Sequence, residues 1–80
     1  MGIETVRLRL VFSEQLIKKP IIFEVTTLFE VVPNILKADI QAEGWVTLDL
    51  SGTPEEVEKA LNWLYGQGVR IEFLFADEVD

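Results

Sequence analysis

Asn34 is the residue of this 80-residue chain whose type and position most clearly suggest binding chemistry. It opens the segment 34–40, in which Leu36, Ala38 and Ile40 alternate with polar residues, so a polar amide occupies a position of apolar parity. An Asn side chain both donates and accepts hydrogen bonds, which suits the amino or carboxylate group of a small ligand. The same side chain could instead tie down the backbone where the segment begins, and the residues alone leave both roles open.

A second polar segment, Ser51–Thr53, precedes a strong helix-start signal. Thr53 can cap the helix, Pro54 can occupy its first position, and Glu56 can reach back to complete a capping box. The exposed amides of a helix N-terminus favour an anionic group such as a carboxylate. We expect Asn34 to lie beside Ser51–Thr53 at one end of a sheet, where together they would form a site for an amino acid.

The composition excludes several classes of chemistry. The chain contains no Cys and no His, which excludes cysteine nucleophiles, iron–sulfur ligation and histidine-based acid–base or zinc chemistry. The serines therefore lack a histidine base, and no glycine-rich phosphate loop is present. We expect no enzyme activity, no catalytic residues, no metal site and no cofactor.

Charge and hydropathy restrict the partners and the location. The formal net charge of −7 would be repelled by nucleic acids and by anionic membranes. No apolar run approaches the ~20 residues of a transmembrane helix. Glu4, Arg7 and Arg9 interrupt the N-terminal stretch that a signal peptide would need. We expect a cytoplasmic protein with no nucleic-acid partner and no membrane insertion.

Hydrophobic periodicity predicts four strands. Apolar and polar residues alternate with the period of two that is typical of half-buried strands. A tight hairpin turn is expected at Glu43–Gly44. The predicted strands cover residues 4–12, 34–40, 45–50 and 69–75.

Two helices are predicted between these strands. One follows Thr53 and ends near Gly66 or Gly68, since glycine can adopt the left-handed conformation. Residues 21–30 are ambiguous, because their β-branched residues favour a strand whereas their apolar spacing and Pro20 favour a helix. We predict a helix there, broken by Val31–Pro33, because the residue before a proline is pushed out of the helical region.

Charged residues on the strands predict a polar outer face of the sheet. Arg7 and Arg9 would lie beside Asp49 and Glu72, which places opposite charges across neighbouring strands. Two arginines could form an anion site, but exposed ion pairs on a solvated face are the commoner arrangement. Apolar residues on the same face could mark a subunit contact: Val11, Ile35, Trp45 and Leu74.

The order and spacing of several short segments resemble the NIL domain, a small ferredoxin-like module named for an Asn-Ile-Leu motif. The resemblance covers essentially the whole chain, which we treat as one domain, residues 1–80. It implies an α+β, ferredoxin-like βαββαβ sandwich with a four-stranded antiparallel sheet and two helices on one face, and it favours the helix at 21–30. The segments are Arg7–Leu10, Asn34–Leu36, Ala38–Ile40, Leu50–Gly52, Ala60–Leu64 and Gly68–Val69.

NIL domains are found at the C-terminus of ATPase subunits of methionine-importing ABC transporters and in fusions to iron–sulfur ferredoxins. The resemblance therefore implies a regulatory module that binds an amino acid, with methionine as the leading candidate. The ligand-binding residues that it implies are Asn34, Ile35 and Leu36. It also implies a transporter or another protein as a partner. We expect a stand-alone, non-catalytic homodimer. Pro33 departs from the family because it removes a backbone donor before the motif. We also expect no attached ATPase or cysteine-bearing ferredoxin module.

A protein-interaction or assembly module is the competing class. Such a module would keep the fold but dock a partner on the outer sheet face or on the edge of the strand at 34–40, with no small-molecule ligand. Stabilisation by an amino acid distinguishes the two classes.

Overall fold

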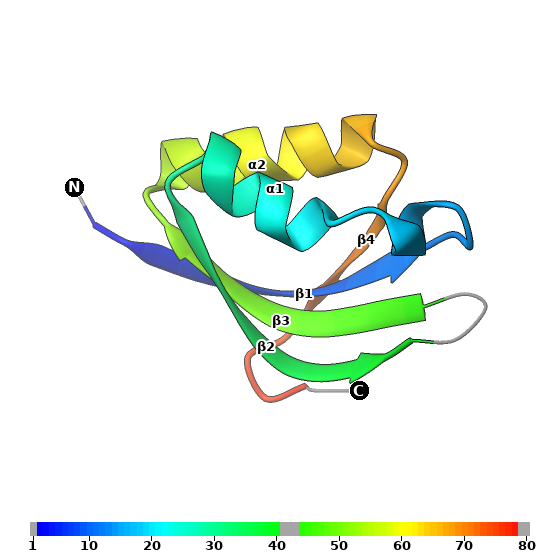
Figure 1. The fold of residues 1–80 in the computed structure, drawn as a ribbon. Helices are drawn as coiled ribbons and strands as arrows, with labels where there is room; N and C mark the ends of the chain where they lie inside the picture. The colour runs from blue at the N-terminus through cyan, green and yellow to red at the C-terminus, as the bar shows by residue number, and fades with distance from the viewer. Residues whose placement is uncertain (1, 41–43, 79–80) are drawn as a thin grey trace.

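Strand β1 (Glu4–Phe12) lies inside the sheet of this computed structural model, which describes residues 2–40 and 44–78. It pairs antiparallel with β3 (Gly44–Gly52) and with β4 (Arg70–Leu74), and β2 (Val31–Asp39) pairs antiparallel with β3. The strand order is β2-β3-β1-β4. Helices α1 (Ile21–Leu28) and α2 (Pro54–Gly66) lie on one face of this sheet (Figure 1). The arrangement confirms the predicted α+β, ferredoxin-like sandwich.

The core lies between the helices and the inner face of the sheet. Leu8 of β1 stands opposite Leu48 of β3, and both side chains are almost fully buried because the strand alternation directs them under the helices. Burying one such side chain contributes about 1.5–3 kcal/mol, so this layer is the main source of stability. The buried apolar residues are Leu8, Leu10, Phe12, Ile21, Val25, Val31, Val46, Leu48, Leu50, Val57, Ala60, Leu64, Val69 and Ile71.

The ambiguous segment 21–30 is mostly helical, which confirms the choice of a helix. Pro20 precedes the first helical residue, and the N–H of Phe29 donates to the Val25 carbonyl at 3.1 Å where the helix ends. The helix ends at Leu28, so Val31–Pro33 are non-helical as predicted, but these residues already belong to β2 and pair with β3, whereas the strand was predicted to begin at 34. A proline fits there because β2 is an edge strand, in which every second N–H needs no partner.

The hairpin between β2 and β3 is described only in part. Glu43 of the turn predicted at Glu43–Gly44 lies outside the described residues, and Gly44 is the first residue of β3. A Cβ atom at Gly44 would overlap the Cδ1 atom of Ile17. The side chain of Ile17, which belongs to a short 3₁₀ helix, Leu16–Lys18, thus packs directly against the start of β3.

Thr53 caps α2 as predicted. Its Oγ1 atom accepts the Glu56 N–H at 3.3 Å, and Pro54 is the first helical residue. The other half of the predicted capping box is wrong: the Glu56 carboxylate accepts the N–H of Glu30 at 2.8 Å and pairs with Lys59 at 3.2 Å. These contacts, the Glu30 N–H first, lower the pKa of Glu56. They fasten the start of α2 to the connection between α1 and β2.

The end of α2 agrees with the predicted termination at glycine. The helix ends at Gly66, and Gly68 adopts a φ of 92°, in the left-handed region that favours glycine. The N–H of Val69 then donates to the Leu64 carbonyl at 3.2 Å. This turn directs the chain into β4.

Thr53→Ala should lower the free energy of unfolding by about 1 kcal/mol, because it removes the oxygen that accepts the Glu56 N–H. Urea denaturation followed by circular dichroism measures the loss. Thr53→Ser keeps the hydroxyl and serves as the matched control. Equal denaturation midpoints for wild type and Thr53→Ala would show that the cap does not stabilise α2.

Candidate functional site

A β-bulge in β2 determines which way the Asn34 motif faces. Asn34 stands opposite Asp49, but Lys37 stands opposite Thr47, so Leu36 is an extra residue between the two pairs. The bulge reverses the alternation of side chains from one part of the strand to the next. Asn34 therefore shares the outer face with Lys37 and Asp49, away from the helices. The predicted apolar parity of Asn34 is wrong for this reason.

Asn34 presents an unoccupied amide on that outer face. Its side chain is exposed, and within residues 2–40 and 44–78 it makes no hydrogen bond. The amide thus does not fasten the backbone between α1 and β2, which was the structural alternative. Its donor and acceptor groups are available to a ligand or a partner.

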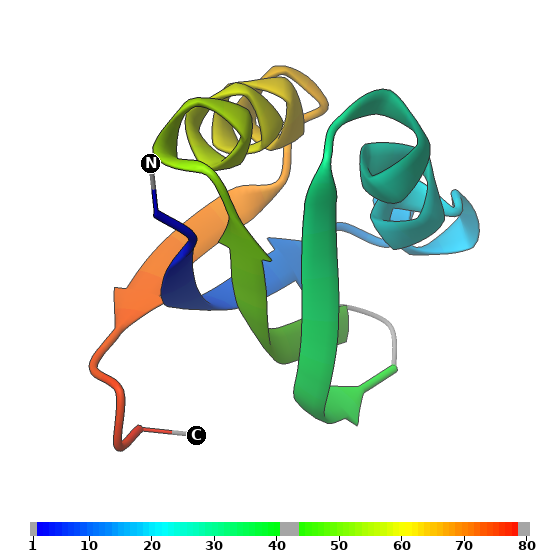
Figure 2. The same cartoon turned by 90° about the vertical axis from the view of Figure 1, so that its left-hand side faces the viewer.

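The neighbours of Asn34 differ from those predicted. Because β2 begins at Val31, it is Val32 that stands opposite Ser51, and Asn34 lies farther along the sheet. Helix α2 starts on the opposite side of the sheet from the outer face (Figure 2). Ser51 shares the outer face and is a diagonal neighbour of Asn34 across the two strands, but the predicted combination of Asn34 with the N-terminus of α2 is not formed.

The other two motif residues, Ile35 and Leu36, lie at the edge of the sheet and differ in their pairing with β3. Ile35 stands opposite Leu48, so it faces the helix layer, and its predicted place on the outer face is wrong. It is nevertheless 53% exposed, because β2 lies at the edge of the sheet. Leu36 is half-buried at the bulge. Of the three motif residues, Asn34 is therefore the one that places a polar side chain on the outer face.

An ionised carboxylate lies in the same cross-strand row as the Asn34 amide. Asp49 accepts two hydrogen bonds from Arg7, at 2.8 and 3.0 Å, which confirms the predicted pair. The hydrogen bonds from Arg7 hold the pKa of Asp49 below its ordinary value, and they raise the pKa of Arg7. Each carboxylate oxygen can accept a further bond. The row therefore offers an amide and a negatively charged acceptor side by side.

Arg7 also holds the segment that follows β4. One terminal nitrogen donates to the carbonyl oxygens of Ala76 and, at 3.2 Å, of Glu78. The chain after β4 thus returns along the side of the sheet away from the helices (Figure 1). Sequence reasoning missed this contact, because a backbone carbonyl that accepts from an arginine leaves no signal in the sequence.

Arg9 is likewise engaged by neighbours on the outer face. It pairs with Glu72 at 3.4 Å, as predicted, and its guanidinium lies 5.3 Å from the centre of the Trp45 ring. Thr47 stands opposite Arg9 and is fully buried. The Arg9 Nε and Thr47 Oγ1 atoms are buried without a hydrogen-bond partner in the described structure. Since both arginines are paired with carboxylates, the outer face is an ion-paired surface rather than a two-arginine anion site.

Arg7→Gln should raise the pKa of Asp49 towards the value of about 3.9 for an unperturbed aspartate, because it removes the hydrogen bonds that favour the charged form. In the wild type the folded-state pKa of Asp49 is depressed. The resulting stabilisation is therefore fully present above the unfolded-state pKa and is lost as the pH falls through the folded-state pKa. An NMR titration of the Asp49 carboxyl carbon measures the pKa of Asp49 in the wild type and in Arg7→Gln. Arg70→Gln, which removes a pair with Glu72 instead, should leave Asp49 unchanged; an unchanged Asp49 in Arg7→Gln would contradict the assignment.

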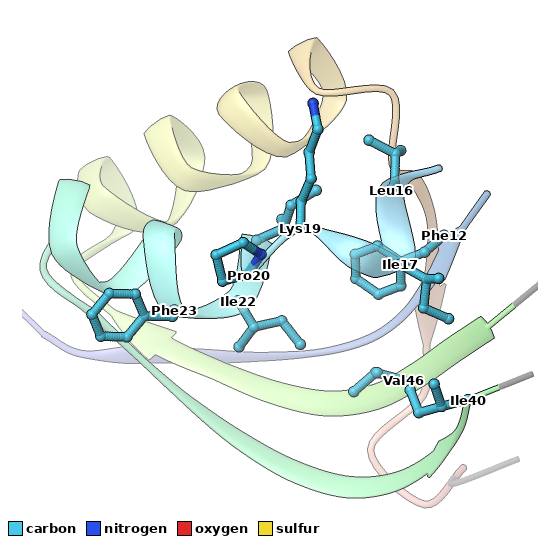
Figure 3. A pocket seen from close by; sticks show the side chains of 10 residues that line it. Phe12, Leu16, Ile17, Lys19, Pro20, Ile22, Phe23, Ile40 and Val46 are labelled. Carbon is cyan, nitrogen blue, oxygen red and sulfur yellow. The ribbon is translucent and has the colours of Figure 1, made fainter. Parts of the chain in front are cut away.

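An apolar cavity lies on the other side of the sheet. It occupies about 160 Å³ between the 3₁₀ helix, the first turn of α1 and the adjoining ends of β2 and β3 (Figure 3). Lys19 lines it together with apolar side chains that include Phe12, Ile17, Ile22, Phe23, Ile40 and Val46. No sequence motif indicated this cavity, because its walls come from four separate segments.

Two further properties concern metals and membranes. Within residues 2–40 and 44–78, no group of three or more Asp, Glu, His or Cys is arranged to hold a metal ion. In the same residues, no helix has both the length and the apolar character needed to cross a membrane.

Comparison with known proteins gave one finding on the family. Residues 6–73 match the model of the NIL domain family. The match includes both helices and all four strands, apart from the start of β1 and the end of β4. No curated protein matches the chain.

Proposed function

Because the chain belongs to the NIL domain family of small regulatory modules, we propose that it is a cytoplasmic, non-catalytic module that binds an amino acid such as methionine. The observation that supports this proposal is the row formed by the free Asn34 amide and the ionised Asp49 carboxylate on neighbouring strands. The Asn34 amide can donate to the α-carboxylate of an amino acid, and the Asp49 oxygens, which already accept from Arg7, can each accept a further hydrogen bond from its α-ammonium.

The proposed recognition uses both ends of the zwitterion. The α-carboxylate accepts a hydrogen bond from the Asn34 amide, and the α-ammonium donates to Asp49, which remains charged because of Arg7. Val32 lies on the same face and is 67% exposed, so it offers an apolar contact for the ligand's side chain. Ile35 and Leu36 contribute to the site by forming the bulge beside Asn34. There, Leu36 has no partner on β3.

A homodimer completes this site. Small-molecule sites usually bury about 70–90% of the ligand, but an open strand face covers only one side of it. A second copy of the chain, against the outer face or the β2 edge, supplies the missing cover. Pro33, the bulge and Lys37 blunt the edge itself, so the outer face carries part of the contact. Sedimentation equilibrium should show a dimer at high micromolar concentration, and a 9.1 kDa monomer under these conditions would contradict it.

A thermal-shift screen against the twenty amino acids tests the binding function. A ligand at 100-fold its dissociation constant adds about 2.7 kcal/mol to stability, which raises the melting temperature of a domain this size by several degrees. We expect L-methionine to give the largest shift. If none of the twenty raises the melting temperature at millimolar concentration, the binding function is wrong.

A protein-interaction module is the second candidate, and the exposed apolar residues at the other edge of the sheet favour it. Phe73 and Phe75, at the end of β4 and just beyond, are 62% and 78% exposed. Exposed aromatic residues of this kind are enriched at protein interfaces. No response to amino acids, together with loss of a transporter or other protein partner in Phe73→Ser and Phe75→Ser, would favour this function.

A further inference from the structure

The apolar cavity offers a ligand site separate from the Asn34 row. It lies on the helix side of the sheet, where Ile17, Ile22 and Val46 form its walls (Figure 3). Asn34 faces the opposite side. An occupant of the cavity therefore does not contact the proposed amino-acid site, and the inference is independent of that proposal.

The size and lining of the cavity define the apolar part of an occupant. An enclosed apolar cavity of about 150 Å³ accepts a molecule of the size of benzene, and this one, which is open to solvent on one side, measures about 160 Å³. A hydrocarbon group of about six carbon atoms thus fits it. Phe23 and Ile40 at the rim are 66% and 64% exposed, and such a group would cover part of both side chains.

The charge at the cavity defines the polar part. Among the described residues that line it, Lys19 is the only charged one. Its side chain extends away from Ile22, Ile40 and Val46, with the ammonium at its far end (Figure 3). The Lys19 ammonium makes no ion pair or hydrogen bond within residues 2–40 and 44–78. A carboxylate therefore has a partner there, whereas an α-ammonium group would find no anionic acceptor among the lining residues.

We propose that this cavity binds a small aliphatic monocarboxylate that lacks an α-amino group. Its hydrocarbon chain occupies the space between the 3₁₀ helix, α1 and the sheet. Its carboxylate faces Lys19, whose four-carbon stem lets the ammonium reach the mouth.

Three ligands with the same six-carbon chain and different head groups test the proposal: hexanoate, hexan-1-ol and norleucine. Methyl NMR titrations should shift the resonances of Ile17, Ile22 and Ile40, with the highest affinity for hexanoate and the lowest for norleucine. Lys19→Gln should weaken hexanoate by up to about five-fold, the strength of an exposed ion pair, and leave hexan-1-ol unchanged. Lys18→Gln is the matched control, because Lys18 does not line the cavity.

Two groups of results overturn the proposal, one for the hydrocarbon chain and one for the carboxylate. If neither hexanoate nor hexan-1-ol shifts these methyl resonances, or if Val46→Leu, which fills the space, binds hexanoate as well as the wild type does, the cavity takes no hydrocarbon chain. Equal affinities for the three ligands, or an unchanged hexanoate affinity in Lys19→Gln, would remove the carboxylate assignment. Asn34→Ala should bind hexanoate normally, which separates this site from the amino-acid site.

Discussion

Asn34→Ala should abolish stabilisation by L-methionine while changing the unfolding free energy of the unliganded protein by less than about 0.5 kcal/mol. The reason is that Asn34 is exposed and its side chain makes no hydrogen bond within the described residues, so its removal leaves no buried group without a partner. The lost ligand effect corresponds to about 2.7 kcal/mol when methionine is present at 100-fold its dissociation constant. Paired melting curves with and without methionine measure both quantities.

The control for this experiment is Asn62→Ala, which removes an exposed amide from α2 instead of β2. It should keep the full response to methionine. The account of the site would be wrong if Asn34→Ala retained the response, or if it lost 1–3 kcal/mol of stability without ligand, since a loss of about that size indicates a buried group deprived of its partner.

Leu8→Ala should cost about 2–5 kcal/mol, the largest stability effect expected for this chain. Leu8 is completely buried on the strand that lies between β3 and β4, and truncation leaves a cavity beneath both helices. A domain of 80 residues has a total stability of about 4–12 kcal/mol, so this variant should lose a large part of its stability and unfold at a clearly lower urea concentration than the wild type. Urea denaturation measures the loss.

Phe73→Ala is the matched control for that substitution. Phe73 stands directly opposite Leu8 and has the same apolar parity, but it is 62% exposed at the β4 edge. Its truncation should cost less than about 1 kcal/mol, although a larger side chain is removed. Equal losses for the two variants would contradict the arrangement in which the helices cover β1 and leave the β4 edge open.

Local sequence patterns predicted the elements where local physics determines them. The alternation of apolar and polar residues correctly predicted β1 and its buried residue Leu8. The Thr53-Pro54 pair correctly predicted the start of α2. Both signals depend only on residues that are close together in the sequence. The opposite charges of Arg7 and Asp49 also predicted a real ion pair. Such features need no knowledge of the rest of the fold.

The candidate site was less predictable, because it depends on the register of two strands. A single extra residue at Leu36 reverses the alternation, so a pattern of period two read back from Ile40 assigned Asn34 to the wrong face. The sequence likewise allowed the Glu56 carboxylate to accept either the Thr53 N–H of a capping box or a distant N–H. Tertiary packing brings it to the Glu30 N–H. The cavity beside Lys19 arises from packing alone.

Titration of the ¹⁵N-labelled protein with L-methionine tests the proposed amino-acid site most directly. The side-chain amide of Asn34 and the backbone amides around the bulge and around Asp49 should shift together and saturate with one dissociation constant. Methionine methyl ester, which lacks the carboxylate charge, should bind more weakly. The proposal would be contradicted if saturating methionine left the Asn34 side-chain resonances unmoved, or if the shifts gathered instead around the cavity at Ile17 and Ile22.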